Sequence, residues 1–108
     1  MDQGEISHLI AYIKGFLKRV HAQEAFLFGS RVRGDNLLES DVDLIVVSED
    51  FARVEFPHRL IFLHSHWDLP YFLEALAYTP EELSRLAKTR GVIAEALKSG
   101  IRITPNQE

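Results

Sequence analysis

Two aspartates, Asp41 and Asp43, are the residues of this sequence best suited to chemistry. They open the run DVDLIVV at residues 41–47, which is typical of a central strand covered on both faces. Because side chains alternate along a strand, both carboxylates project from one face, about 7 Å apart along the chain. Two carboxylates in such a place are costly unless a positive charge lies between them. A divalent cation such as Mg²⁺, which binds carboxylate and phosphate oxygens, is the simplest candidate.

The polar segment before this run supplies groups that suit phosphate. Gly29 has no Cβ and lets main-chain N–H groups approach phosphate oxygens, while Ser30 adds a hydroxyl donor. Arg31 and Arg33 can pair with phosphate oxygens, or can lie in a solvated loop as most arginines do. The segment lacks the G-K-[ST] end of a Walker A loop and has no G-x-G-x-x-G fingerprint. Taken alone, it also fits an ordinary turn after a strand.

Hydrophobic spacing predicts the elements that must position these residues. Thr79, Pro80 and Glu82 form a helix start with a capping box. We expect residues 30–40 to be a loop, with a helical turn at Ser30, and residues 49–58 to be irregular. We expect strands at 24–28, 42–48, 71–78 and 101–103, and helices at 5–21, from near Pro57 through 58–67, from Pro80, and at 90–99.

This order predicts an α/β (α+β) sandwich, in which one small mixed sheet has helices packed mainly on one face. With 108 residues, we expect a single domain spanning residues 1–108. The absence of cysteine excludes a disulfide scaffold, a thiolate zinc site and a cysteine nucleophile. His58, His64 and His66 do not have the spacing of a zinc motif.

Charge and hydropathy indicate which partners and which cellular location to expect. The net charge is −4 and there is no long basic run, which argues against direct nucleic-acid binding as the main role. No apolar run is long enough for a membrane span, and the N-terminus lacks the layout of a signal peptide. We therefore expect a cytoplasmic protein.

The spacing of the two motifs resembles that of a known family. Ten residues, 31–40, separate Gly29 and Ser30 from Asp41 and Asp43, which gives the pattern G-S-x10-D-x-D. This pattern, with the Thr79 to Leu83 helix start (TPEEL), resembles the minimal nucleotidyltransferases of the DNA polymerase β superfamily. The resemblance covers roughly residues 24–86 and is carried by the combined motif rather than by any one part.

The resemblance implies a third carboxylate on a neighbouring strand. Members of the family that resemble this chain carry it six residues before the proline of the TPEE motif, which here indicates Glu74 rather than the more obvious Asp68. Glu74 interrupts an otherwise apolar strand, although an acid on an edge strand can also simply face water. The family pattern more often has Asp at this position.

The resemblance also implies an activity and a partner. A two-metal Mg²⁺ site at Asp41, Asp43 and Glu74 would transfer NMP from an NTP, with ATP as the expected substrate, to a hydroxyl. Gly29, Ser30, Arg31 and Arg33 would bind the nucleotide. Minimal members are typically antitoxins paired with a HEPN-domain toxin, and some adenylylate that partner. The alternatives are an antitoxin that acts by contact alone, or transfer to a small molecule such as an aminoglycoside in a cleft built by a homodimer.

Overall fold

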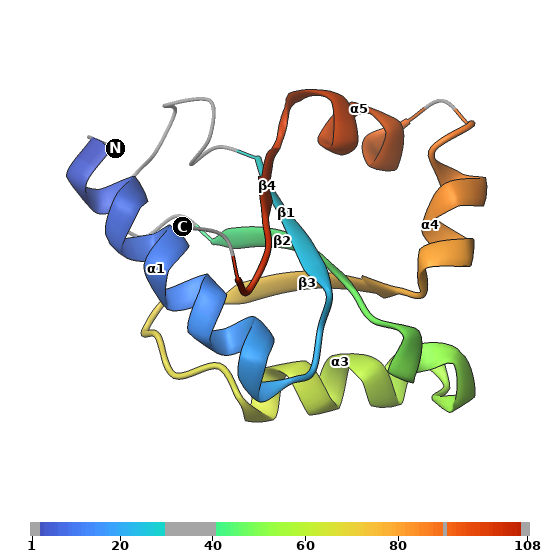
Figure 1. Cartoon of the computed structure of the whole chain (residues 1–108), viewed down its shortest axis with the longest axis horizontal. Coiled ribbons are helices and arrows are strands. Elements are labelled where there is room, and N and C mark those ends of the chain that lie inside the picture. The colour runs from blue at the N-terminus through green and yellow to red at the C-terminus, as the bar shows by residue number, and fades with distance from the viewer. Residues whose placement is uncertain (1–2, 30–40, 90, 107–108) are drawn as a thin grey trace.

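A four-stranded mixed sheet forms the centre of the computed structural model, which describes residues 3–29, 41–89 and 91–106 (Figure 1). The strand order is β3-β2-β1-β4. β1 (Glu24–Phe28) pairs antiparallel with both β2 (Val42–Val47) and β4 (Ile101–Ile103), whereas β2 pairs parallel with β3 (Leu73–Tyr78). All four predicted strands are therefore present, although β3 begins later than predicted because the backbone bends at residues 69–71.

The helices lie where hydrophobic spacing predicts them, with one addition. They are α1 (Gln3–Arg19), α3 (Phe56–Ser65), α4 (Pro80–Leu86) and α5 (Val92–Ser99). The predicted capping box is present: the Thr79 hydroxyl accepts from the Glu82 N–H, and the Glu82 carboxylate accepts from the Thr79 N–H. Part of the segment expected to be irregular forms a 3₁₀ helix, η1 (Glu49–Arg53), because the Ser48 side chain accepts from the Asp50 N–H and starts the turn.

Helices cover the two faces of the sheet unequally. α1 and α3 pack on one face and form the larger core with alternate residues of β2, Val42, Leu44 and Val46. α4 and α5 contribute to a smaller core on the opposite face, where Ile45 and Val47 lie. Figure 1 shows α5 crossing above the sheet while α1 and α3 lie below and beside it. The predicted fold class is confirmed, with the larger core between α1, α3 and the sheet.

Within the described ranges, no helix is both long and apolar enough to cross a membrane. The predicted loop at 30–40 lies outside the described residues.

Candidate active site

The alternation of β2 places Asp41 and Asp43 on the face of the sheet that carries α5. Asp43 lies between the buried Val42 and Leu44, whose side chains enter the larger core on the other face. It is half-buried, whereas Asp41 is exposed just before the strand begins. The Asp43 carboxylate therefore projects from within β2, whereas Asp41 directly precedes the strand.

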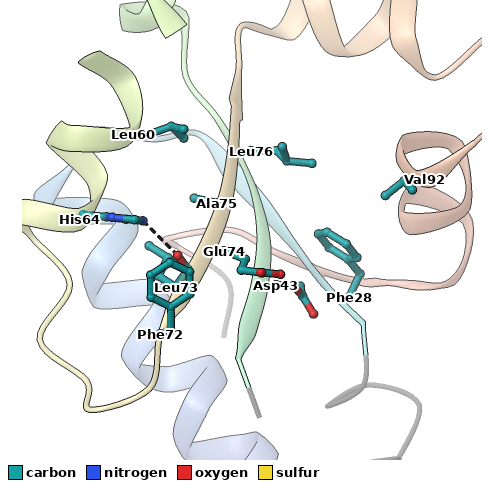
Figure 2. Close-up of a pocket in the computed structure, with 10 residues that line it drawn as sticks. All are labelled: Phe28, Asp43, Leu60, His64, Phe72, Leu73, Glu74, Ala75, Leu76 and Val92. Carbon is teal, nitrogen blue, oxygen red and sulfur yellow. Dashed lines mark hydrogen bonds between the residues drawn. The ribbon is translucent and has the colours of Figure 1, made fainter. Parts of the chain in front are cut away.

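Glu74 lies directly beside Asp43. β2 and β3 are parallel, and their register pairs Asp43 with Glu74. Because side chains at paired positions of adjacent strands project from the same face, the two carboxylates share the side of the sheet that faces α5. Figure 2 shows the Glu74 carboxylate directed towards Asp43. β3 is an edge strand and Glu74 is exposed, so this carboxylate is also accessible to solvent.

Gly29 makes room for the Asp43 carboxylate. The backbone of Gly29 has φ +85°, in the left-handed region that favours glycine. A Cβ built there would overlap the Asp43 carboxylate and lie 2.8 Å from its Cγ. β1 pairs with β2 so that Phe28, the residue before Gly29, is opposite Asp43. The glycine thus allows the end of β1 to lie against the Asp43 side chain.

An apolar pocket of about 410 Å³ opens next to these carboxylates. Asp43 and Glu74 contribute its two acidic groups, and His64 also lines it (Figure 2). The apolar side chains that line it come from β1, α3, β3 with the residue before it, and α5: Phe28, Leu60, Phe72, Leu73, Ala75, Leu76 and Val92. Such a pocket, apolar with a few convergent polar groups, has the character of a small-molecule or side-chain binding site.

The carboxylates of this site suit a hard divalent cation, but only two of the three predicted ligands lie together. Asp43 and Glu74 supply the carboxylate oxygens that Mg²⁺ prefers, and the missing Cβ of Gly29 leaves room for the Asp43 carboxylate. In the part of the chain that the structure describes, no group of three or more His, Asp or Glu side chains is arranged to hold a metal ion. The structure therefore brings together two of the three expected ligands, with Asp41 on the same face but not grouped with them.

Three of the predicted nucleotide-binding residues, Ser30, Arg31 and Arg33, lie outside the described residues. Of that predicted set, only Gly29 has a described position.

Asp68, the other candidate for a third acid, is remote from this group. It lies between α3 and β3, where its backbone N–H donates to the Tyr12 hydroxyl of α1 at 2.7 Å. It is exposed and does not line the pocket. Of these two acids, Glu74 is therefore the one that is paired with Asp43 in the sheet.

Sequence reasoning missed a buried cation at the other end of β3. Arg59 of α3 is 6% exposed and donates through both terminal nitrogens to Glu82, at 2.6 and 3.2 Å. It also donates to the carbonyls of Val54 and Ala77. The hydrogen bonds that the Glu82 carboxylate accepts, chiefly from Arg59 and then from the Thr79 backbone, lower the pKa of Glu82 to about 2. The signal in the sequence was an arginine within the apolar run of residues 58–67.

Comparisons with known proteins agree with this fold. The model of a family described as "Nucleotidyltransferase domain" matches residues 10–103. A crystal structure of a proposed nucleotidyltransferase from Sulfolobus solfataricus is similar, with a TM-score of 0.56 and 22% identity over 72% of this chain and 73% of that one. At this identity the likeness concerns the fold alone. No curated protein matches the chain.

Proposed function

The chain belongs to the nucleotidyltransferase domain family, and on that premise we propose that it transfers AMP from ATP to a hydroxyl group in the presence of Mg²⁺. Membership makes the protein a nucleotidyltransferase, which transfers a nucleoside monophosphate. One observation carries the finer assignment: Glu74 lies beside Asp43, whose carboxylate contacts Gly29, and both acids line an apolar pocket. ATP is chosen because the sequence resembles minimal nucleotidyltransferases.

In this reaction the acceptor oxygen forms a bond to the α-phosphorus as the bond to the bridging oxygen breaks and pyrophosphate leaves. Glu74, which lines the pocket from the edge strand β3, accepts the proton of the acceptor hydroxyl. Asp41, Asp43 and Glu74 are the residues that would hold Mg²⁺, which neutralises phosphate charge when bound. Gly29 keeps the Asp43 carboxylate at the end of β1, where the predicted phosphate-binding segment begins. Most of the catalysis by these residues is then positioning and electrostatics.

The rim of the pocket supports a protein as the acceptor. Phe72 is 59% exposed and Val92 is 66% exposed, and both line the pocket that contains Glu74. Exposed apolar side chains around a polar centre are typical of surfaces that bind another protein. We propose that this rim receives a HEPN-domain partner, the class of partner that the family resemblance implies, and that a hydroxyl of that partner enters the pocket.

The same rim favours a second candidate function, neutralisation of the partner by contact. In this alternative the exposed Phe72 and Val92 bind the partner, and Glu74 is an edge-strand acid that faces water. The two candidate functions predict different effects of substituting Asp43. Loss of its charge abolishes nucleotide binding and transfer in the first, and leaves neutralisation of the partner intact in the second.

Calorimetric titration of ATP, with and without Mg²⁺, tests the proposed activity. We expect Mg²⁺-dependent binding by the unmodified chain and loss of binding in Asp41→Asn/Asp43→Asn. Asp50→Asn is the matched control, because this exposed acid follows the opposite end of β2. Equal ATP affinity with and without Mg²⁺ would refute the site as described.

A further inference from the structure

His64 is a residue of the pocket for which the proposed reaction has no role. It lies in the last turn of α3, and its Nε2 is 2.9 Å from the carbonyl oxygen of Leu73 (Figure 2). Because a carbonyl can only accept, Nε2 must carry the hydrogen and donate it. The residue that follows Leu73 is Glu74, so the donor reaches the backbone next to the proposed catalytic acid.

The carbonyl of Leu73 is one that the sheet itself cannot satisfy. Val42 of β2 donates to the carbonyl of Phe72, so the carbonyl of the next residue, Leu73, points away from β2. Among the described strands β3 is the last on that side, and therefore none of them can pair with this carbonyl. At the start of β3, the His64 side chain supplies the hydrogen bond that a neighbouring strand would otherwise donate.

The same imidazole also contacts the aromatic residue before the strand. The rings of His64 and Phe72 meet edge to face, with centroids 5.6 Å apart. The hydrogen bond and this ring contact therefore hold the backbone at residues 72 and 73 from outside the sheet. Glu74 directly follows these two residues and is paired with Asp43 in the register of β2 and β3.

We propose that His64 is a positioning residue, which fixes the start of β3 through the Leu73 carbonyl and thereby orients the Glu74 carboxylate towards Asp43. The proposal rests on the proposed function for its purpose, since an oriented Glu74 matters only if the carboxylate binds metal or accepts a proton. The hydrogen bond itself is independent of that function. Outer residues that orient ligands in this way typically change metal affinity by about 10-fold to 100-fold when replaced.

Two substitutions separate the hydrogen bond from the ring contact. His64→Phe keeps an aromatic ring against Phe72 and removes the donor, whereas His64→Gln keeps a donor at a similar distance and removes the ring. His58→Ala, at an exposed position of the same helix, is the matched control. Glu74→Gln shows the effect of losing the carboxylate charge itself.

The test uses two measurements on the whole chain. NMR three-bond couplings between Hα and Hβ of Glu74 report whether its side chain holds one rotamer, and electron paramagnetic resonance of free Mn²⁺ reports metal affinity. We expect averaged couplings and about 10-fold weaker Mn²⁺ binding in His64→Phe. His64→Gln and His58→Ala should resemble the unmodified chain in both measurements, while Glu74→Gln should weaken Mn²⁺ binding at least as much as His64→Phe.

Either of two results would overturn the proposal. His64→Phe could retain the couplings of the unmodified chain, or His64→Gln could be as impaired as His64→Phe, which would show that the donor is not what matters. Absence of Mn²⁺ binding by the unmodified chain would instead contradict the proposed function. In that case the Glu74 couplings alone would decide whether His64 positions the side chain.

Discussion

Gly29 and Asp43 lie so close together that any side chain at position 29 would occupy the space of the Asp43 carboxylate. The contact joins the end of β1 to the strand that carries the proposed site, and the left-handed backbone of Gly29 is part of it. The glycine of the G-S motif therefore has a structural role that does not depend on a ligand: it leaves room for the Asp43 carboxylate.

Gly29→Ala should reduce Mg²⁺-dependent ATP binding strongly, because Cβ displaces the Asp43 carboxylate. It should also lower the free energy of unfolding by about 1–2 kcal/mol, because a side chain disfavours a positive φ. Calorimetry and urea denaturation measure the two effects.

Gly15→Ala is the control for that substitution. A Cβ at Gly15 in α1 would meet only the end of the Arg19 side chain, at 3.7 Å. We expect a gain of about 0.5–1 kcal/mol in the free energy of unfolding and unchanged ATP binding. Equal losses of binding in the two variants would contradict the role assigned to Gly29.

Glu74→Gln should have opposite effects on stability and activity. Like charges at directly paired strand positions repel, and Glu74 is the register partner of Asp43. In the absence of metal, the variant should melt at the same temperature as the unmodified chain or slightly higher. A drop of several degrees, measured by circular dichroism in chelator, would show that the Glu74 charge is a structural ion-pair partner instead.

The pair of Arg59 and Glu82 predicts how stability changes in acid. The pKa of Glu82 falls from 4.5 to about 2 on folding, so the unfolded chain binds this proton first. The contribution of the pair is therefore fully present above about pH 4.5 and is lost as pH falls towards 2. Urea denaturation at pH 7 and pH 3 should show this loss in the unmodified chain.

Glu82→Gln should remove that part of the acid dependence. At pH 7 the variant should lose about 2 kcal/mol, because the buried Arg59 loses its charged acceptor. At pH 3 the difference between the variant and the unmodified chain should be smaller. A difference that is the same at both pH values would show that the charge of Glu82 is not what stabilises the fold.

Local patterns predicted the strands and helix starts of this chain well. The run at Glu24–Phe28 ends at a glycine, and the Thr79 capping box fixes the start of α4; each signal lies within a few residues of its effect. The alternation of β2 likewise places Asp43 opposite the larger core. These features depend on backbone propensity and side-chain period, which the sequence displays directly.

Contacts between residues that are distant in the sequence were harder to predict. The pairing of Asp43 with Glu74 depends on β3 lying parallel to β2, which only a family spacing indicated beforehand. The burial of Arg59 depends on Glu82 and on carbonyls from other elements, and no local pattern encodes such a meeting. The residues that line the pocket come from five separate segments, so Phe72 and Val92 could not be assigned to one site from spacing alone.

Pyrophosphate release from ATP and Mg²⁺ in the presence of a HEPN-domain partner tests the central claim most directly, when compared between Glu74→Gln and Asp68→Asn. Glu74→Gln should slow release by about 10²–10⁴-fold while nearly preserving ATP binding, because glutamine cannot accept the acceptor's proton. Asp68→Asn should release pyrophosphate at the unmodified rate, since Asp68 lies outside the pocket. An active Glu74→Gln together with an inactive Asp68→Asn would contradict the account.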